Sequence, residues 1–295
     1  INKNMLTWRF PIERIKALVY LSGSGIDDEK NAFAQYTNRL ISLIDALPAH
    51  GKYHILGFDW HYLKGGERHE GKSTFYTSNE CIEYLWKKRP DLFVPVISVH
   101  PYRKDAVARL DYWAGKGVRY IKWLPSAQGI DPSDPDNDNY YRTMIRNNMV
   151  LLSHVGEEKA VEAEQDQELA NPLCFRRPLD MGLKIIMAHA GSLGKNRDVD
   201  KGANAGLVDN FDLFIRLFGE KRYRDNLFGE ISGMTLHNRL QAGDGEDPPL
   251  VKLMRRDGLR RQLATRFVNG SDYPLIAINI VIRTGTLVKL GLITA

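Results

Sequence analysis

Short apolar runs rich in β-branched residues recur along the chain and alternate with longer segments patterned for helix. Seven of these runs predict buried β-strands: 53–59, 93–100, 118–123, 149–154, 183–189, 226–232 and 266–272. Because the runs are continuously apolar, they predict strands covered on both faces, as in a parallel sheet. The segments between them place apolar residues on one helical face, as Ala106, Leu110 and Trp113 show.

The spacing of the runs selects among the parallel folds. They recur about every 35 residues, as do the strand–helix units of a (β/α)8 barrel, which typically has ~250 residues. A doubly wound sheet is the alternative, but it usually carries a glycine-rich phosphate loop, and no G-x-G-x-x-G motif occurs here. We therefore expect an α/β chain forming one (β/α)8 TIM barrel, with residues 1–295 as a single domain.

The eighth strand of such a barrel is not evident. The run 17–23 could supply it but has no polar residue suited to catalysis. We instead expect residues 1–50 to be a helical lead-in. The first strand is expected upstream of residue 1, or in a segment that a structure leaves undescribed.

Polar residues end the predicted strands, and they are Asp59, His100, Lys122, His154, His189, Glu230 and Asp272. In a parallel barrel the carboxyl ends of the strands face the active site. A single histidine after an apolar run is usually a hydrogen-bonded core residue, but three of the eight histidines close three different strands here. Imidazoles and a carboxylate on one rim are the ligands that a divalent ion such as Zn²⁺ prefers.

The sequence around these positions resembles the strand ends of the amidohydrolase superfamily. The motifs are "SVHPYR" (98–103), "YIKWLPSAQGIDPSDP" (120–135), "LLSHVGEE" (151–158), "IIMAHAGS" (185–192) and "VNGSDYP" (268–274). They are most similar to the amidohydrolase-2 branch of metal-dependent hydrolases and decarboxylases, over roughly residues 50–290. The resemblance implies that His154 is a metal ligand and that Asp272 binds metal and accepts the proton of the attacking water. It implies that His189 is a ligand or orients the reacting group.

The cofactor implied by the resemblance is one divalent ion, with zinc as the first choice; a second ion stays open. The sequence departs from the family at its start, where no His-x-His pair ends a first strand. His54 and His61 are too far apart to replace it. The pair lies upstream or the metal site has been lost, and the absence of an initiator Met favours the first.

The remaining strand-end residues have weaker assignments. Lys122 is expected to pair with an acidic substrate or to pack as a structural residue, and carboxylation of its amine to bridge two metals is disfavoured. His100 either holds a turn or meets substrate, and Asp59 lines the pocket. We predict Lys122, His100 and Asp59 as substrate-binding residues, and Glu230 as structural or supporting.

These residues predict a metal-dependent hydrolase in which metal-activated water attacks a C–N or C–O bond of a small substrate. A decarboxylase or hydratase with the same site is one alternative, and a barrel that binds a ligand without catalysis is another. A glycoside hydrolase would need two convergent carboxylates, for which Glu230 and Asp272 could serve, but it leaves the histidines unexplained.

Charge and cysteine content limit the classes of molecule that the protein is expected to bind. The net charge is +5, but 41 basic residues are scattered among 36 acidic ones. The densest basic run, 252–262, has its Leu and Met at helical spacing and reads as a solvated helix face rather than a nucleic-acid surface. Two cysteines exclude a disulfide framework and fit a reducing compartment such as the cytoplasm. We expect a small-molecule substrate, no nucleic acid and no membrane; a homo-oligomer is left open.

Overall fold

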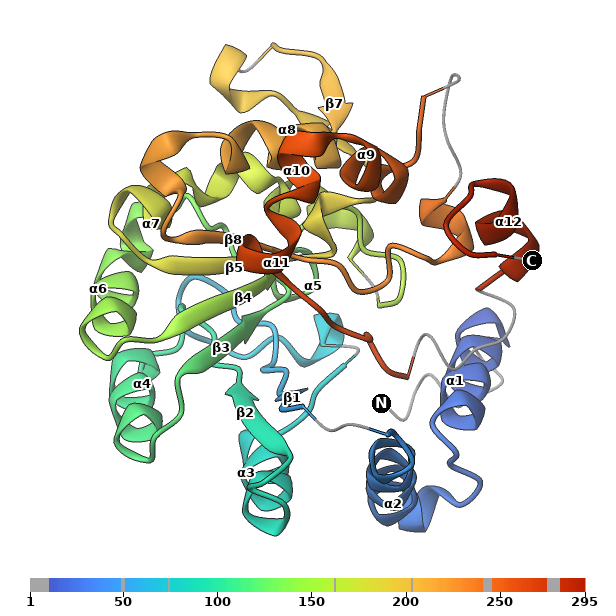
Figure 1. Ribbon diagram of the computed structural model, residues 1–295. Helices are drawn as coiled ribbons and strands as arrows, with labels where there is room; N and C mark the ends of the chain where they lie inside the picture. The colour runs from blue at the N-terminus through green and yellow to red at the C-terminus, as the bar shows by residue number, and fades with distance from the viewer. Residues whose placement is uncertain are drawn as a thin grey trace.

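The computed structural model describes residues 11–48, 51–73, 75–161, 163–202, 204–240, 246–274 and 282–294. Its main element is a seven-stranded parallel sheet in the order β1-β2-β3-β4-β5-β8-β9 (Figure 1). The strands are β1 (Tyr53–Leu56), β2 (Phe93–Ile97), β3 (Tyr120–Trp123), β4 (Val150–His154), β5 (Lys184–Ala188), β8 (Leu227–Glu230) and β9 (Phe267–Val268). Each begins inside one of the seven apolar runs, so the predicted strands are confirmed.

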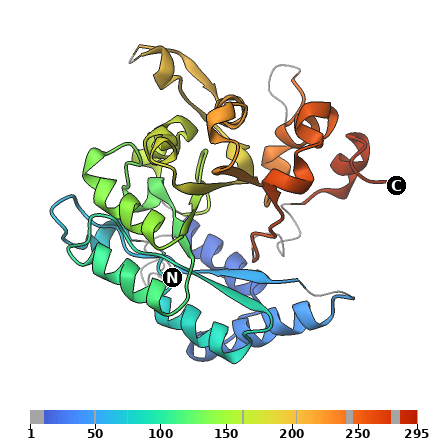
Figure 2. The ribbon, with the colours of Figure 1, turned by 60° about the vertical axis from the view of Figure 1, so that its left-hand side comes forward.

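The sheet curls as the strands of a TIM barrel do, and the predicted α/β class is confirmed (Figure 2). No pairing joins β9 to β1 among the described strands, so the part of the sheet that the structure describes is a half-barrel. The run 17–23, considered above as a strand, lies in helix α1 (Pro11–Gly23). The N–H of Ser24 donates to the carbonyl of Tyr20, the spacing of an α-helical turn.

Helices connect the strands, and Figure 1 shows α3, α4, α6 and α7 along the outer side of the sheet. The helices are α1, α2 (Ala32–Asp45), α3 (Asn79–Lys88), α4 (Ala106–Gly115), α5 (Pro125–Gln128), α6 (Asp138–Arg146), α7 (Arg176–Asp180), α8 (Asn210–Phe218), α9 (Pro249–Arg255), α10 (Asp257–Arg260), α11 (Leu263–Arg266) and α12 (Thr284–Lys289). None of the described helices has the length and apolar character needed to cross a bilayer.

A small antiparallel hairpin interrupts the alternation between β5 and β8. It consists of β6 (Lys195–Arg197) and β7 (Leu207–Asp209). The sequence pattern did not predict it, because its strands are three residues long and largely polar or exposed.

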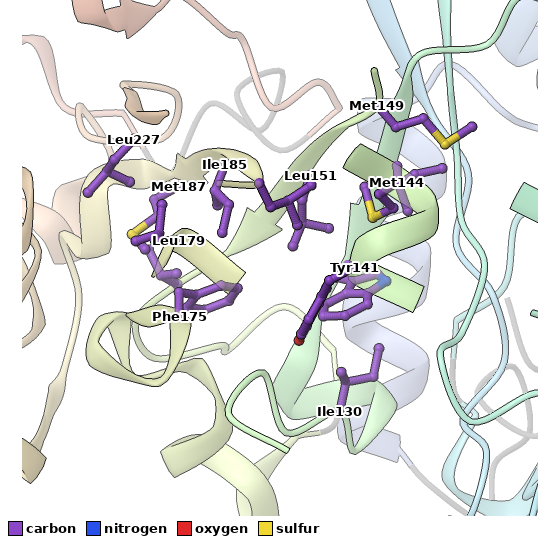
Figure 3. Packing of buried hydrophobic residues seen from close by; sticks show 14 of the residues in the cluster. Ile130, Tyr141, Met144, Met149, Leu151, Phe175, Leu179, Ile185, Met187 and Leu227 are labelled. Atoms are coloured by element: carbon purple, nitrogen blue, oxygen red, sulfur yellow. The ribbon is translucent and has the colours of Figure 1, made fainter. Parts of the chain in front are cut away.

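The main hydrophobic core lies between the sheet and the outer helices. In Figure 3, Ile185 and Met187 of β5 lie beside Phe175 and Leu179, and all four side chains are buried. Burial of one such side chain contributes ~1.5–3 kcal/mol. This packing buries one face of the strands in the core.

Side chains alternate along a strand, so the other face of the sheet carries the next residue in each case. On β4 the core face takes Leu151, and the inner, concave face takes Leu152 and His154. The register pairs Lys122 with Leu152, so that Lys122 of β3 shares this inner face. The inner face is therefore where the strand-end residues predicted for chemistry come together.

The last strand, β9, is short, and the aromatic ring of Phe267 packs where it pairs with β8. Strand β9 pairs with β8 at only two positions, Gly229 with Phe267 and Glu230 with Val268. A side chain at Gly229 would clash with the ring of Phe267. The ring also lies 5.1 Å from that of Phe218 and 6.2 Å from that of Phe214, measured between centroids.

Candidate functional site

Two buried imidazoles meet at the ends of neighbouring strands. His154 is the last residue of β4 and is in register with Ala188, so His189 follows one position beyond the end of β5. Their ring centroids are 5.1 Å apart with an interplanar angle of 67°. The two side chains are nearly inaccessible to solvent, with residue exposures of 3% and 6%.

A strained turn presents His189. His189 and Ala190 have φ angles of 59° and 49°, in the left-handed region that residues other than glycine seldom adopt. Nδ1 of His189 lies 2.8 Å from the carbonyl oxygen of Ser232. Because a carbonyl only accepts, Nδ1 is the donor, and the lone pair is left on Nε2. The same arrangement orients histidines that bind metals or move protons.

The carboxylate of Glu230 supports this turn. It accepts hydrogen bonds from the backbone N–H of His189 at 3.1 Å and from the hydroxyl of Ser232 at 2.8 Å. A side chain at Gly270 would clash with the Glu230 carboxylate, which accounts for the glycine that precedes Ser271 and Asp272. Glu230 therefore positions His189, in line with the supporting role expected for it.

His154 contacts its own following loop. Its Nε2 lies 3.2 Å from the carbonyl oxygen of Gly156, and its Nδ1 lies 3.5 Å from Oε2 of Glu158. Burial lowers the pKa of His154 and His189 well below the usual value, so both rings are neutral near pH 7.

The positive charges of Lys122 and Arg239 also lower the pKa of these two histidines, to different relative extents. At His154 the larger cationic influence is Lys122 and the smaller is Arg239. At His189 the order is reversed. Lys122 pairs in register with Leu152 on the strand that carries His154, and Arg239 contacts Ser192 in the loop that follows His189.

Lys122 is 5% exposed, and its ammonium forms no hydrogen bond or ion pair with any described residue. Its Nζ lies 5.9 Å from the centroid of the Phe58 ring. Burial lowers the pKa of Lys122, although the acids Asp272, Glu230 and Glu158 act in the opposite direction.

Arg239 belongs to a short 3₁₀ helix, His237–Arg239, and is 7% exposed. Its Nη1 donates to the hydroxyl of Ser192 at 2.7 Å, while its buried Nε has no partner among the described residues. The sequence pattern does not predict Arg239 as a site residue, because it lies in a loop beyond β8 and ends no apolar run.

Asp272 follows β9 and adopts a left-handed backbone, with φ of 55°. Burial raises the pKa of its carboxyl, and Lys122 and Arg239 oppose that rise. Within the part of the chain that the structure describes, Asp272 makes no hydrogen bond or ion pair with either imidazole. The structure thus brings His154 and His189 into contact and leaves Asp272 coupled to the two cations.

His100 and Asp59 lie apart from the imidazole pair. His100 Nε2 is 2.8 Å from the carbonyl of Gln128, and its Nδ1 accepts the N–H of Tyr102 at 3.1 Å. With both ring nitrogens engaged by backbone, the arrangement favours a role in holding the turn. Asp59 accepts the N–H of His100 at 3.0 Å and lies 3.4 Å from Arg103.

Two cavities lie away from the imidazole pair of His154 and His189. Asp59 lines a polar cavity of about 240 Å³ together with Trp60 and Tyr76. A larger and more open hollow, about 890 Å³, lies on the outer surface beside α6 and α7, where Arg177 pairs with Asp138 at 2.7 Å. Neither hollow is lined by His154 or His189, so cavity size alone does not identify the site.

A family model described as amidohydrolase matches residues 59–279, about three quarters of the 295 residues. The chain belongs to the amidohydrolase family. The resemblance noted in the strand-end motifs is confirmed by this match. No curated protein matches this amidohydrolase.

Solved structures resemble the amidohydrolase at low sequence identity. A probable 2-pyrone-4,6-dicarboxylic acid hydrolase from Acinetobacter baumannii is 14% identical, with a TM-score of 0.52, over 87% of this chain and 82% of that one. A putative hydrolase of the same acid from Pseudomonas putida is 19% identical over 73% and 69%, with a TM-score of 0.46. A 5-carboxyvanillate decarboxylase from Novosphingobium aromaticivorans is 14% identical over 90% and 84%, with a TM-score of 0.44. The first likeness shows the fold alone, and the other two are too weak to add to it.

Membership of the family implies a divalent metal ion, which the donor groups of the amidohydrolase fit in part. His189 presents a free Nε2 lone pair, and His154 is neutral, as metal-bound imidazoles must be. However, no group of three or more His, Cys, Asp or Glu side chains among the described residues is placed to hold a metal. The described residues therefore bring two neutral imidazoles together but not a complete set of metal ligands.

Proposed function

We propose that this amidohydrolase hydrolyses a C–N or C–O bond of a small substrate at His154, His189 and Asp272. The observation that carries the proposal is the pair of neutral, buried imidazoles at the ends of adjacent parallel strands. In barrel enzymes that end of the sheet is where catalytic side chains gather. The proposed partner is a small molecule rather than nucleic acid or a membrane.

The imidazoles of His154 and His189 would bind a divalent ion, with zinc as the first choice, and that ion would lower the pKa of a bound water from ~15.7 toward ~7. The protein's own groups do the rest. Ser232 fixes the tautomer of His189, which leaves the Nε2 lone pair free to bind the ion. Asp272 accepts the proton of the attacking water and returns it to the leaving group, a task favoured by the raised pKa of its carboxyl.

Backbone strain supports the same assignment. Among the described residues other than glycine, only Asn148, His189, Ala190 and Asp272 have positive φ. Asn, Asp and His tolerate this region better than most residues. Even so, such conformations gather at active sites, and two of these four residues are the ones proposed for chemistry.

The substrate is proposed to meet Lys122, whose ammonium has no partner among the described residues. Asp59 and His100 keep weaker support, since backbone and Arg103 already engage them. Decarboxylation by the same residues is the second candidate, and a carboxylated substrate suits the unpaired Lys122.

The test is a substrate screen on the purified chain, with and without chelator. The panel contains lactones, esters and amides of small acids, together with aromatic carboxylic acids whose turnover releases CO2. Hydrolysis that is lost on chelation and restored by added zinc or manganese supports the proposal. Release of CO2 without hydrolysis favours the second candidate, and activity untouched by Asp272→Asn contradicts both.

A further inference from the structure

Two buried cations flank the imidazole pair. Lys122 lies on β3 and Arg239 follows β8, whereas His154 and His189 end β4 and β5, the strands between them. With exposures of 5% and 7%, both cations have lost most of their hydration. A buried charge is costly unless an opposite charge or hydrogen-bond acceptors replace the water.

The acids of the site do not supply those partners. Glu230 accepts from the N–H of His189 and from Ser232, and Glu158 accepts from the N–H of Val161 at 3.2 Å. In the described part of the chain, no carboxylate lies within ion-pair distance of Lys122 or Arg239. The ammonium and the Nε–H of the guanidinium therefore remain as unused donors.

Other buried cations of this chain are used differently. Lys252, 9% exposed, pairs with Glu246 at 2.8 Å. Arg266, also 9% exposed, has an Nε without a partner among the described residues, but its guanidinium donates to the carbonyls of Phe218 and Leu227. Among the described residues, Arg239 has only the hydroxyl of Ser192 as a hydrogen-bond partner, and Lys122 has no hydrogen-bond or ion-pair partner. The contrast separates these two cations from those that hold the fold together.

We propose that the site binds a small dicarboxylate, with one carboxylate on the Lys122 ammonium and the other on the Arg239 guanidinium. The bond to be cleaved then lies between the anchors, at His154 and His189. The planar fork of Arg239 suits a carboxylate in two-point contact, and the ammonium of Lys122 acts as a point charge. This deepens the proposed function, on which it rests, by naming the substrate class of the same site.

Binding to the full chain tests the inference by titration calorimetry. The ligands are straight-chain diacids from malonate to suberate, each with its monomethyl and dimethyl ester. This range of lengths covers anchors on elements three strand spacings of ~4.8 Å apart. At least one diacid should bind about 10-fold or more tightly than its monoester, and the monoester about 10-fold more tightly than the diester.

Variants assign the two anchors. Lys122→Met and Arg239→Gln should each weaken binding of the diacid about 10-fold or more and leave the diester unchanged. In either variant, diacid and monoester should then differ by much less than in the wild type. Arg239→Lys, which keeps the charge without the fork, should bind between wild type and Arg239→Gln. Arg222→Gln is the matched control, because exposed Arg222 pairs with Asp180 at 3.0 Å away from the site.

The inference is overturned if no diacid binds more tightly than its diester, or if Lys122→Met binds diacids as the wild type does. A folded Lys122→Met protein keeps this test open even where Arg239→Gln fails to fold. Because binding is measured, the outcome is separate from turnover. Diacid binding without hydrolysis of any ester or amide contradicts the proposed function and supports the dicarboxylate site. Hydrolysis without preference for diacids does the reverse.

Discussion

Lys122→Met should make the protein more stable, which is unusual for a substitution in a buried position. The pKa of Lys122 is lowered by burial even though Asp272, Glu230 and Glu158 favour the charged form. The cost of dehydrating the ammonium therefore exceeds its attraction to these acids. Methionine has a similar length and removes the charge while filling the space.

The size of the gain follows from the missing partner. A buried polar group without a hydrogen bond costs about 1–3 kcal/mol. Since the ammonium has no partner among the described residues, we expect the free energy of unfolding to rise by about this amount. For a chain of 295 residues, that corresponds to a Tm increase of roughly 2–5 °C. The assay is urea unfolding followed by circular dichroism, with thermal scans alongside.

The pH dependence has a definite sign. Lys122 titrates below 10.5 in the folded protein and near 10.5 in the unfolded chain. Between these two pKa values the unfolded chain binds more protons, so wild-type stability rises with pH. The destabilising effect of Lys122 is complete below its folded pKa and disappears as the pH approaches 10.5. The advantage of Lys122→Met should therefore shrink in alkaline solution.

Lys252→Met is the matched comparison, with the opposite expectation. Lys252 is also buried, but its ion pairs with Glu246 and Asp212 raise its pKa. Removing it should lower stability or leave it unchanged. If Lys122→Met is destabilised as Lys252→Met is, or if its advantage does not depend on pH, the interpretation of Lys122 as an unpaired cation is refuted.

Three further predictions concern the strand ends. Asp272→Asn should lower turnover by ~10²–10⁴-fold while keeping bound metal, whereas His154→Ala should lower the metal content found by elemental analysis after dialysis; full activity in Asp272→Asn contradicts the proton-accepting role. Gly270→Ala should lower the free energy of unfolding, because the added Cβ meets the Glu230 carboxylate. Gly258→Ala, in open space on α10, should instead raise it by up to ~1 kcal/mol. Equal effects of the two substitutions in thermal scans would exclude the clash. Glu230→Gln should cost ~1–3 kcal/mol of stability and lower kcat more than it changes KM, since it loosens the His189 turn; unchanged kinetics would make Glu230 purely structural.

The sequence was enough to predict where the imidazoles lie, for a simple physical reason. His154 and His189 each follow a continuous apolar run, and parallel strands bring their carboxyl ends to one edge. The seven parallel strands of the curled sheet were predictable from the same runs. The role of His100 was not, because its ring nitrogens are engaged by backbone groups of Gln128 and Tyr102. A sequence pattern gives a residue's place on a strand but not the partners of its ring.

Arg239 shows the other limit of sequence patterns. It lies nine positions after Glu230 in a loop segment with no regular apolar pattern, where an arginine is ordinarily solvated. Its burial results from tertiary packing, through the contact with Ser192 on the loop after β5. The β6–β7 hairpin escaped prediction for a related reason, since Leu207 and Lys195 are exposed and leave no apolar pattern to recognise.

The ring of Phe267 links the strand that leads to Asp272 with the aromatic core of α8. Asp272 reaches the site from a strand that pairs at only two positions, and the Phe267 ring above Gly229 holds that strand against Phe214 and Phe218. Substitutions at Phe214 or Phe218 are therefore expected to shift the Phe267 ring and, through β9, the carboxylate of Asp272. Core aromatic residues of α8 are thus coupled, through a single ring, to the short strand that leads to Asp272.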